Sequence, residues 1–175
     1  MRRTFILTAC LLFAAGCATP NLRVWHNANL KATGAIGSRG DAVYYSVCIG
    51  TDEFPYDGRQ AFAIRLPSGV LLSSDDFAES TIRPIALALL KTGDSIIRHD
   101  PKRGRHRYFL EGVGFEYEGD QLVTLDISRV WFKEKGCIPA IAKTASGTFH
   151  PFPVPEKHLN EIFGPPDKTE DSFRW

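Results

Sequence analysis

Histidine and carboxylate side chains are the groups in this chain that could bind a metal ion or transfer a proton. The five histidines are dispersed along the sequence: His26, His99, His106, His150 and His158. None of them stands in an H-E-x-x-H motif or in another close metal-ligand spacing, which would let one segment supply several ligands. The sequence therefore predicts no metal and no cofactor, and a metal site would have to be assembled by folding.

Residues for nucleophilic or phosphate chemistry form no known motif. The chain has no G-x-S-x-G, no glycine-rich phosphate loop and no dinucleotide-binding fingerprint. The run 73–76, Ser-Ser-Asp-Asp, is better explained by helix capping than by a nucleophile and its base. Glu116 and Glu118 alternate on a predicted strand and so project to one face, but exposed sheet faces commonly carry such acids. We therefore expect no catalytic residues.

A basic run between residues 102 and 107 concentrates positive charge in a predicted loop. Its lysine and arginine residues are Lys102, Arg103, Arg105 and Arg107. The run is either a solvated connection between strands or a contact site for an acidic partner or lipid headgroups. Tyr56 and Trp131 are further candidates for partner binding, because tyrosine and tryptophan dominate the energetics of many protein interfaces.

The N-terminus combines positive charge, an apolar stretch and a cysteine. The arginines at positions 2 and 3 precede the apolar stretch 4–15, which has the length of a signal-peptide core and is too short for a comfortable transmembrane helix. Small residues at positions 14–16 then precede Cys17. This segment resembles the signal peptide and lipobox of bacterial lipoproteins, although Ala14 stands where that family usually has leucine.

The resemblance implies cleavage before Cys17 and attachment of lipid to that cysteine. Several acyl chains make such an anchor effectively stable, whereas one chain alone binds reversibly. Ala18 follows the cysteine in place of the aspartate associated with inner-membrane retention, which favours the outer membrane and its periplasmic face. The alternative is an ordinary secretory signal cut near Ala18. We expect a signal peptide at 1–16, a lipidated tether at 17–22, one globular domain at 23–166 and a charged tail at 167–175.

Net charge indicates which partners the mature domain binds, and cysteine content indicates the state of its thiols. Of 175 residues, 21 are basic and 20 acidic, and loss of the two arginines in the signal leaves 19 basic residues and a net charge of −1. This balance argues against nucleic-acid binding, which needs clustered positive charge. Once Cys10 leaves with the signal and Cys17 carries lipid, Cys48 and Cys137 remain. In an oxidising compartment we expect them to form a disulfide; two buried thiols or a redox pair are the alternatives.

The pattern of apolar residues predicts an α+β domain, mainly an antiparallel β-sheet with one or two short helices packed on it. We expect strands over 23–29, 41–49, 60–66, 70–72, 107–110, 113–117 and 121–127, with 130–132 extending the sheet. Glu118-Gly119-Asp120 predicts a tight hairpin turn with Gly119 at positive φ. The segment 34–40, with its three glycines, is expected to form a loop or turn.

The remaining segments are expected to form the helices and the C-terminal tail. The best helix is expected over 155–163, where Leu159, Ile162 and Phe163 share one apolar face. Acidic residues after Ser74 favour a second helix start, which Pro84 should interrupt. The apolar run 85–91 is then either a short helix that opens at Pro84 or a buried strand. Prolines at 151, 153 and 155 should forbid regular pairing, and the charged tail should be loose.

We interpret the mature domain as a binding module whose partner is another protein. The most specific hypothesis is an immunity protein that neutralises a secreted toxic enzyme, such as a phospholipase or wall hydrolase. An accessory subunit of an envelope assembly or secretion machine is the first alternative. The second is a small periplasmic hydrolase whose site is assembled from dispersed residues such as His26, His99, His106, His150, Asp75, Glu116 and Glu118.

Overall fold

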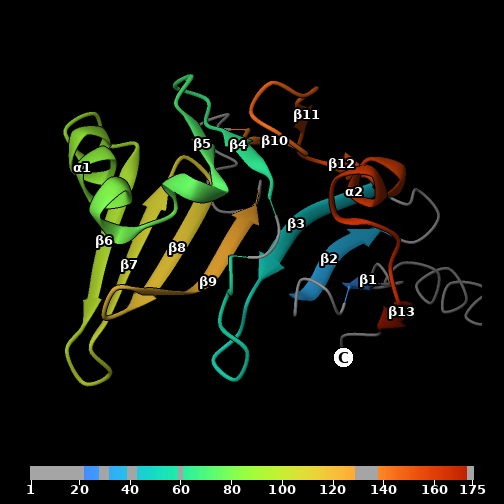
Figure 1. Cartoon of the computed structure of the whole chain (residues 1–175), viewed down its shortest axis with the longest axis horizontal. Coiled ribbons are helices and arrows are strands. Elements are labelled where there is room, and N and C mark those ends of the chain that lie inside the picture. The colour runs from blue at the N-terminus through green and yellow to red at the C-terminus, as the bar shows by residue number, and fades with distance from the viewer. Residues whose placement is uncertain (1–21, 28–31, 39–42, 59–60, 129–137, 173–175) are drawn as a thin grey trace, which may run out of the picture.

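Antiparallel β-sheet predominates in the computed structural model, which describes residues 22–27, 32–38, 43–58, 61–128 and 138–172 (Figure 1). The larger sheet is built from β1 (Leu22–Asn27), β2 (Ala32–Ser38), β3 (Val43–Ile49), β6 (Ser95–Asp100), β7 (Arg105–Leu110), β8 (Val113–Glu118), β9 (Gln121–Ser128), β12 (Val154–Pro155) and β13 (Lys168–Ser172). Within these residues its order is β13-β1-β2-β3-β9-β8-β7-β6, with β12 paired to β3 beside this path.

A smaller sheet lies over the larger one. It consists of β4 (Ala63–Arg65), β5 (Leu71–Ser73), β10 (Ala140–Ala142) and β11 (His150–Pro151), in the order β11-β10-β4-β5. The helix α1 (Glu79–Leu90) covers the β6 and β7 end of the larger sheet, and α2 (Glu156–Phe163) lies over its other half (Figure 1). The two helices and the smaller sheet therefore share one face of the larger sheet.

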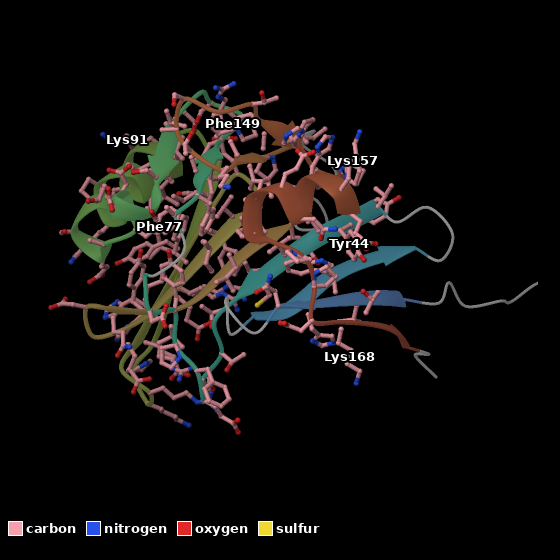
Figure 2. The ribbon with its side chains drawn as sticks, turned by 45° about the vertical axis from the view of Figure 1, so that its right-hand side comes forward. Tyr44, Phe77, Lys91, Phe149, Lys157 and Lys168 are labelled. Atoms are coloured by element: carbon pink, nitrogen blue, oxygen red, sulfur yellow. The ribbon has the colours of Figure 1, made fainter. Side chains whose placement is uncertain are left out.

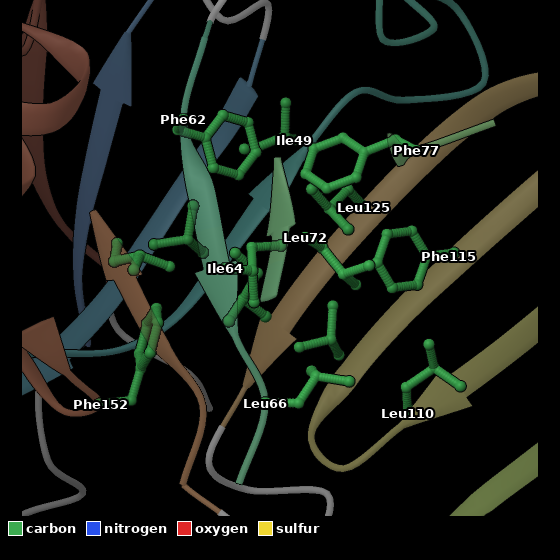
Figure 3. Close-up of a cluster of buried hydrophobic side chains, with 14 of the residues drawn as sticks. Ile49, Phe62, Ile64, Leu66, Leu72, Phe77, Leu110, Phe115, Leu125 and Phe152 are labelled. Carbon is green, nitrogen blue, oxygen red and sulfur yellow. The ribbon is translucent and has the colours of Figure 1, made fainter. Parts of the chain in front are cut away.

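The hydrophobic core fills the space between the two sheets (Figure 3). Phe115 and Leu125 from the larger sheet and Ile64 and Leu72 from the smaller sheet are at most 2% exposed. Burial of each such side chain stabilises the fold by about 1.5–3 kcal/mol. The opposite face of the larger sheet carries polar and charged side chains, including Glu116.

The helix α2 confirms the prediction for its segment. Its buried residues are Leu159, Ile162 and Phe163, the three that the sequence pattern placed on one face. Trp25 on β1 packs against Phe163, with ring centroids 6.2 Å apart, and its indole Nε1 donates to Asn160 Oδ1 at 3.1 Å. Figure 2 shows Tyr44 beside the same helix. These contacts fix α2 on the sheet.

The predicted α+β class is confirmed, as is the hairpin between β8 and β9. Glu118 pairs with Gln121, and Gly119 adopts a φ of 59° in the turn between them. The strand after residue 121 departs from strict alternation of its side chains between the two faces of the sheet. A bulge at Val123 brings Leu122 to the core face beside Tyr117, so Leu122 lies on the same face as Leu125.

Pro84 does not interrupt the helix, contrary to the sequence prediction. It lies inside α1, where it lacks the N–H that would bond one turn back. Ile82 and Ala86 on either side are fully buried, and Ser95 Oγ on β6 donates to Ala86 O at 2.6 Å. Tertiary packing against β6 and β7 thus outweighs the lost hydrogen bond.

Three further predictions of irregular chain are wrong because strand pairing overrides local composition. The glycine-containing segment expected as a loop forms β2, which pairs with strands on both sides. Most of the expected loose tail forms β13, paired with β1. The proline-rich stretch makes two short pairings, β11 with β10 and β12 with β3. The expected strand at 130–132 lies outside the described residues.

No helix in the described ranges is long and apolar enough to span a membrane.

Candidate functional site

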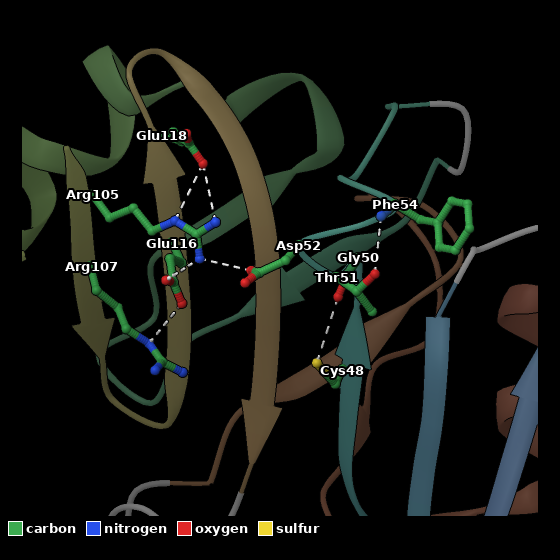
Figure 4. A network of polar contacts seen from close by, with 9 residues as sticks. All are labelled: Cys48, Gly50, Thr51, Asp52, Phe54, Arg105, Arg107, Glu116 and Glu118. Carbon is green, nitrogen blue, oxygen red and sulfur yellow. Dashed lines mark hydrogen bonds and ion pairs between the residues drawn. The ribbon is translucent and has the colours of Figure 1, made fainter. Parts of the chain in front are cut away.

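Arg105 stands at the centre of a group of carboxylates on the polar face of the larger sheet (Figure 4). Its Nη1 lies 2.7 Å from Asp52 Oδ1 and 3.3 Å from Glu116 Oε1. Its Nη2 lies 3.1 Å from Glu118 Oε2, to which Nε also donates at 3.3 Å. We call Arg105, Asp52, Glu116 and Glu118 the Arg105 cluster.

The cluster follows from strand register and from one turn. Arg105 pairs with Glu118 across β7 and β8, and Arg107 pairs with Glu116. Because alternate residues of a strand share a face, all four side chains project to the same side. Asp52 comes from the turn after β3, in which Thr51 N donates to Phe54 O and Phe54 N donates to Thr51 Oγ1. Segments distant in sequence thus meet at one guanidinium.

Two of the three carboxylates in the Arg105 cluster are largely exposed to solvent, whereas the guanidinium is mostly covered. The Arg105 side chain is only 13% exposed, whereas those of Asp52 and Glu118 are 61% and 57% exposed. The hydrogen bond to Asp52 raises the pKa of Arg105 above its usual range, with Glu118 acting in the same direction. The guanidinium therefore stays charged. The three carboxylates of the cluster outnumber this cation and Arg107, which contacts Glu116.

Arg107 extends the network across the sheet. Its Nε lies 3.7 Å from Glu116 Oε2, and its guanidinium carbon lies 4.6 Å from the ring centroid of Phe109. Arg98 on β6 approaches the same ring at 5.6 Å. Cation–π contacts of this kind keep both guanidinium groups against the sheet.

Phe54 is exposed at the edge of the cluster. Its side chain points away from Arg105 in Figure 4 and is 55% exposed. The turn described above holds the backbone at this residue. Exposed aromatic side chains are typical of the residue composition of protein interfaces.

The predicted partner-binding residues that the structure describes lie in different parts of the fold. Lys102 and Arg103 are exposed in the turn between β6 and β7, as a loop prediction requires. Arg105 and Arg107 instead belong to β7, and carboxylates neutralise them. Tyr56 is half-buried against Phe62 and Phe77, and burial followed by the charges of Asp57 and Asp75 raises its pKa to about 12. Trp131 lies outside the described residues.

The cysteine predictions fall largely outside the described chain. Cys48 is half-buried on β3, and its Sγ lies 4.0 Å from Gly50 O. Cys137 and Cys17 lie outside the described residues, so the disulfide and the lipid attachment stay predictions.

Folding brings the dispersed histidines together in two pairs. The rings of His99 on β6 and His106 on β7 lie 4.5 Å apart. Those of His150 on β11 and His158 on α2 stack at 3.7 Å, and His158 Nδ1 lies 2.9 Å from Glu161 Oε2. We call His150, His158 and Glu161 the histidine cluster.

Two members of the Arg105 and histidine clusters, Glu161 and Asp52, were not predicted from the sequence. Only Glu161 has a local signal in the sequence. Glu161 stands three residues after His158 on the best predicted helix, a spacing that places both on one face. Asp52 had no such signal, because it joins Arg105 across 53 residues of sequence.

Neither cluster can be compared with a known site through relatives. No family model matches the chain, and no curated protein and no solved structure matches it. The function has to be argued from the geometry of the sites themselves.

Proposed function

We propose that the protein is a lipid-anchored binding module of the bacterial envelope, and most specifically an immunity protein that neutralises a secreted toxic enzyme. The sequence around Cys17 supports an anchor at the periplasmic face of the outer membrane. The Arg105 cluster supports the binding role and is the observation on which the proposal rests.

The Arg105 cluster has the properties of a preorganised binding surface. Its guanidinium is mostly covered and holds the exposed carboxylates of Asp52 and Glu118 by charge-assisted hydrogen bonds. Groups that are already ordered lose little conformational freedom on binding, so more of the contact energy appears as affinity. Phe54, two residues after Asp52 on the same turn, adds an exposed aromatic side chain.

The charge of the surface specifies the chemistry of the partner. The cluster together with Arg107 holds three carboxylates against two guanidinium groups, and this negative balance favours a partner face that carries lysine or arginine side chains. An enzyme that binds an anionic substrate, such as a phospholipase, needs a basic site of this kind. Carboxylates placed in such a site would exclude the substrate, which is how a binding module would neutralise the enzyme.

The proposal is tested by affinity capture. A tagged chain without residues 1–17 serves as bait for envelope and secreted fractions of its own host, and captured proteins are identified by mass spectrometry. We expect one stoichiometric enzyme whose activity falls on mixing. Asp52→Lys and Phe54→Ala should each reduce its capture at least about tenfold, the effect of losing roughly 1.4 kcal/mol at an interface.

The matched control is Lys143→Glu, which changes charge at an exposed position after β10 in the smaller sheet. This variant should capture the enzyme as the unmodified chain does. Capture of envelope-machine subunits alone would favour the accessory-subunit alternative. A bait that captures no protein but itself hydrolyses an envelope substrate would favour the hydrolase alternative.

A further inference from the structure

The histidine cluster brings together residues from two separate elements, β11 and α2. His150 begins β11 in the smaller sheet, whereas His158 and Glu161 lie on α2. Figure 2 shows Phe149 and Lys157, the residues preceding the two histidines, on the same upper side of the molecule. One potential ligand atom from each member of the cluster lies within 4.8 Å of those of the other two.

The position of the cluster is fixed by the surrounding packing. The helix α2 is held by the burial of Leu159, Ile162 and Phe163, and these residues leave His158 and Glu161 on a different face. The strand β11 is paired with β10, with His150 opposite Ile141. Because both supports are packed, the approach of the two imidazoles is set by the fold and not by the flexibility of a loop.

The two imidazole rings are stacked. Their centroids are 3.7 Å apart, with 17° between the planes. His158 Nδ1 also lies 2.9 Å from Glu161 Oε2. The fold therefore holds imidazole nitrogens and a carboxylate oxygen close together at this point of the surface.

We propose that the histidine cluster binds one Zn²⁺ ion, with His150, His158 and Glu161 as its protein ligands. Imidazole nitrogen and carboxylate oxygen are both ordinary zinc ligands, whereas Ca²⁺ and Mg²⁺ prefer oxygen alone. Ligand atoms around a tetrahedral zinc ion lie about 3.4 Å apart. Side-chain rotations that turn the two rings out of their stack, so that one nitrogen of each points at the ion, would close the observed limit of 4.8 Å.

The histidine cluster is partly exposed to solvent. Both histidines are half-buried and Glu161 is exposed, so the ion can enter from solvent. Three protein ligands leave a fourth coordination position for water, the arrangement found in open zinc sites. The inference departs from the sequence expectation of no metal, because the ligands come from two segments that only the fold brings together.

Direct titration tests the site. The mature chain, purified in detergent and dialysed against a chelator, is treated with iodoacetamide so that no thiol contributes, and Zn²⁺ binding is measured by calorimetry. We expect one ion per chain. Removal of a histidine ligand, in His150→Ala or His158→Ala, should weaken binding by at least about 100-fold, and Glu161→Gln by about tenfold, since even indirect ligand contacts are worth 10- to 100-fold.

The second histidine pair supplies the matched control. His99→Ala removes a ring from a tilted pair whose rings lie 4.5 Å apart, and it should bind Zn²⁺ as the unmodified chain does. Titration with Co²⁺ gives a second readout, because the visible absorption of a tetrahedral site should disappear in His150→Ala and His158→Ala but persist in His99→Ala. Far-ultraviolet circular dichroism checks that each variant is folded. Absence of one-to-one Zn²⁺ binding, or equal affinity in a folded His158→Ala variant, would overturn the proposal.

Discussion

Arg105 Nη1 and Asp52 Oδ1 lie 2.7 Å apart although 53 residues separate them in the chain. This bond ties the turn after β3 to the β7–β8 ladder on the polar face of the larger sheet. The same turn carries the exposed Phe54, two residues after Asp52. The stability of the sheet and the shape of the proposed binding surface therefore depend on the same guanidinium.

Arg105→Met should destabilise the fold by about 1–3 kcal/mol. The substitution keeps most of the side-chain volume but removes the cation that Asp52, Glu116 and Glu118 share, and Arg107 remains only beside Glu116. Urea unfolding at neutral pH measures the change in the free energy of unfolding. Lys102→Met, on the exposed turn, should change it by less than about 0.5 kcal/mol. Equal stability of the two variants would show that the cluster contributes nothing to the fold.

Gly50→Ala should destabilise the fold by more than about 2 kcal/mol. Gly50 has a φ of 80°, and an added Cβ would lie 2.2 Å from Val123 O and 2.9 Å from Tyr56 N, both backbone atoms. Gly119→Ala provides the comparison, since its φ is 59° but no atom lies within 4 Å of the added Cβ. That variant should lose only about 1 kcal/mol, the cost of the left-handed backbone. Thermal unfolding of the two variants in parallel distinguishes steric clash from backbone strain.

Asp76→Asn should lower stability in a pH-dependent way. The side chain of Asp76 accepts hydrogen bonds from Ser73 Oγ at 2.7 Å and from Ser73 N at 2.8 Å, and these lower its pKa. A carboxyl with a lowered folded pKa stabilises the protein fully above its unfolded pKa of about 3.9, and this stabilisation is lost as the pH falls through the folded value. We expect a loss of about 1 kcal/mol at pH 7.

Urea unfolding of Asp76→Asn and the unmodified protein across a series of pH values provides the check. The difference between them should shrink as the medium becomes acidic. A difference that stays constant with pH would mean that the charge of Asp76 is not responsible.

Cys48 and Cys137 should form a disulfide in protein isolated from an oxidising compartment. Neither thiol should then react with iodoacetamide before reduction, as mass spectrometry of the peptides would show. In the chain-entropy account, closure of so long a loop stabilises by about 4 kcal/mol, so dithiothreitol should lower the unfolding midpoint. Full alkylation of both residues without reduction would contradict the prediction.

Cys17→Ser should release the protein from the membrane. If lipid is attached at this residue, the unmodified chain should incorporate labelled palmitate and sediment with membranes, while the variant should do neither. Cys10→Ser is the control, because that residue leaves with the predicted signal peptide. Membrane association of Cys17→Ser equal to that of the control would rule out the lipid anchor.

Local sequence patterns predicted those parts of the fold that depend on neighbouring residues. The apolar face of α2 and the turn at Gly119 each follow from a few adjacent positions. β2 could not be predicted in this way, because its glycine-containing segment becomes a strand only through pairing with β1 and β3. Similarly, Pro84 remains inside α1 because Ile82 and Ala86 are buried against the sheet.

The candidate sites were predictable only in part, for the same physical reason. The pairing of Glu116 and Glu118 with β7 follows from the hairpin register, and the sequence already placed the two acids on one face. Contacts such as Asp52 with Arg105 depend on how distant segments meet, and no local spacing encodes them. The histidine cluster is intermediate, since His158 and Glu161 share a helix while His150 comes from another element.

A stoichiometric inhibition titration tests the proposed neutralisation of a secreted enzyme by the Arg105 cluster. The captured enzyme is mixed with increasing amounts of the chain, and its residual activity is measured. We expect activity to fall linearly and to end at one chain per enzyme, with Asp52→Lys requiring at least about tenfold more protein. Full activity at a large excess of the unmodified chain would overturn the proposed function.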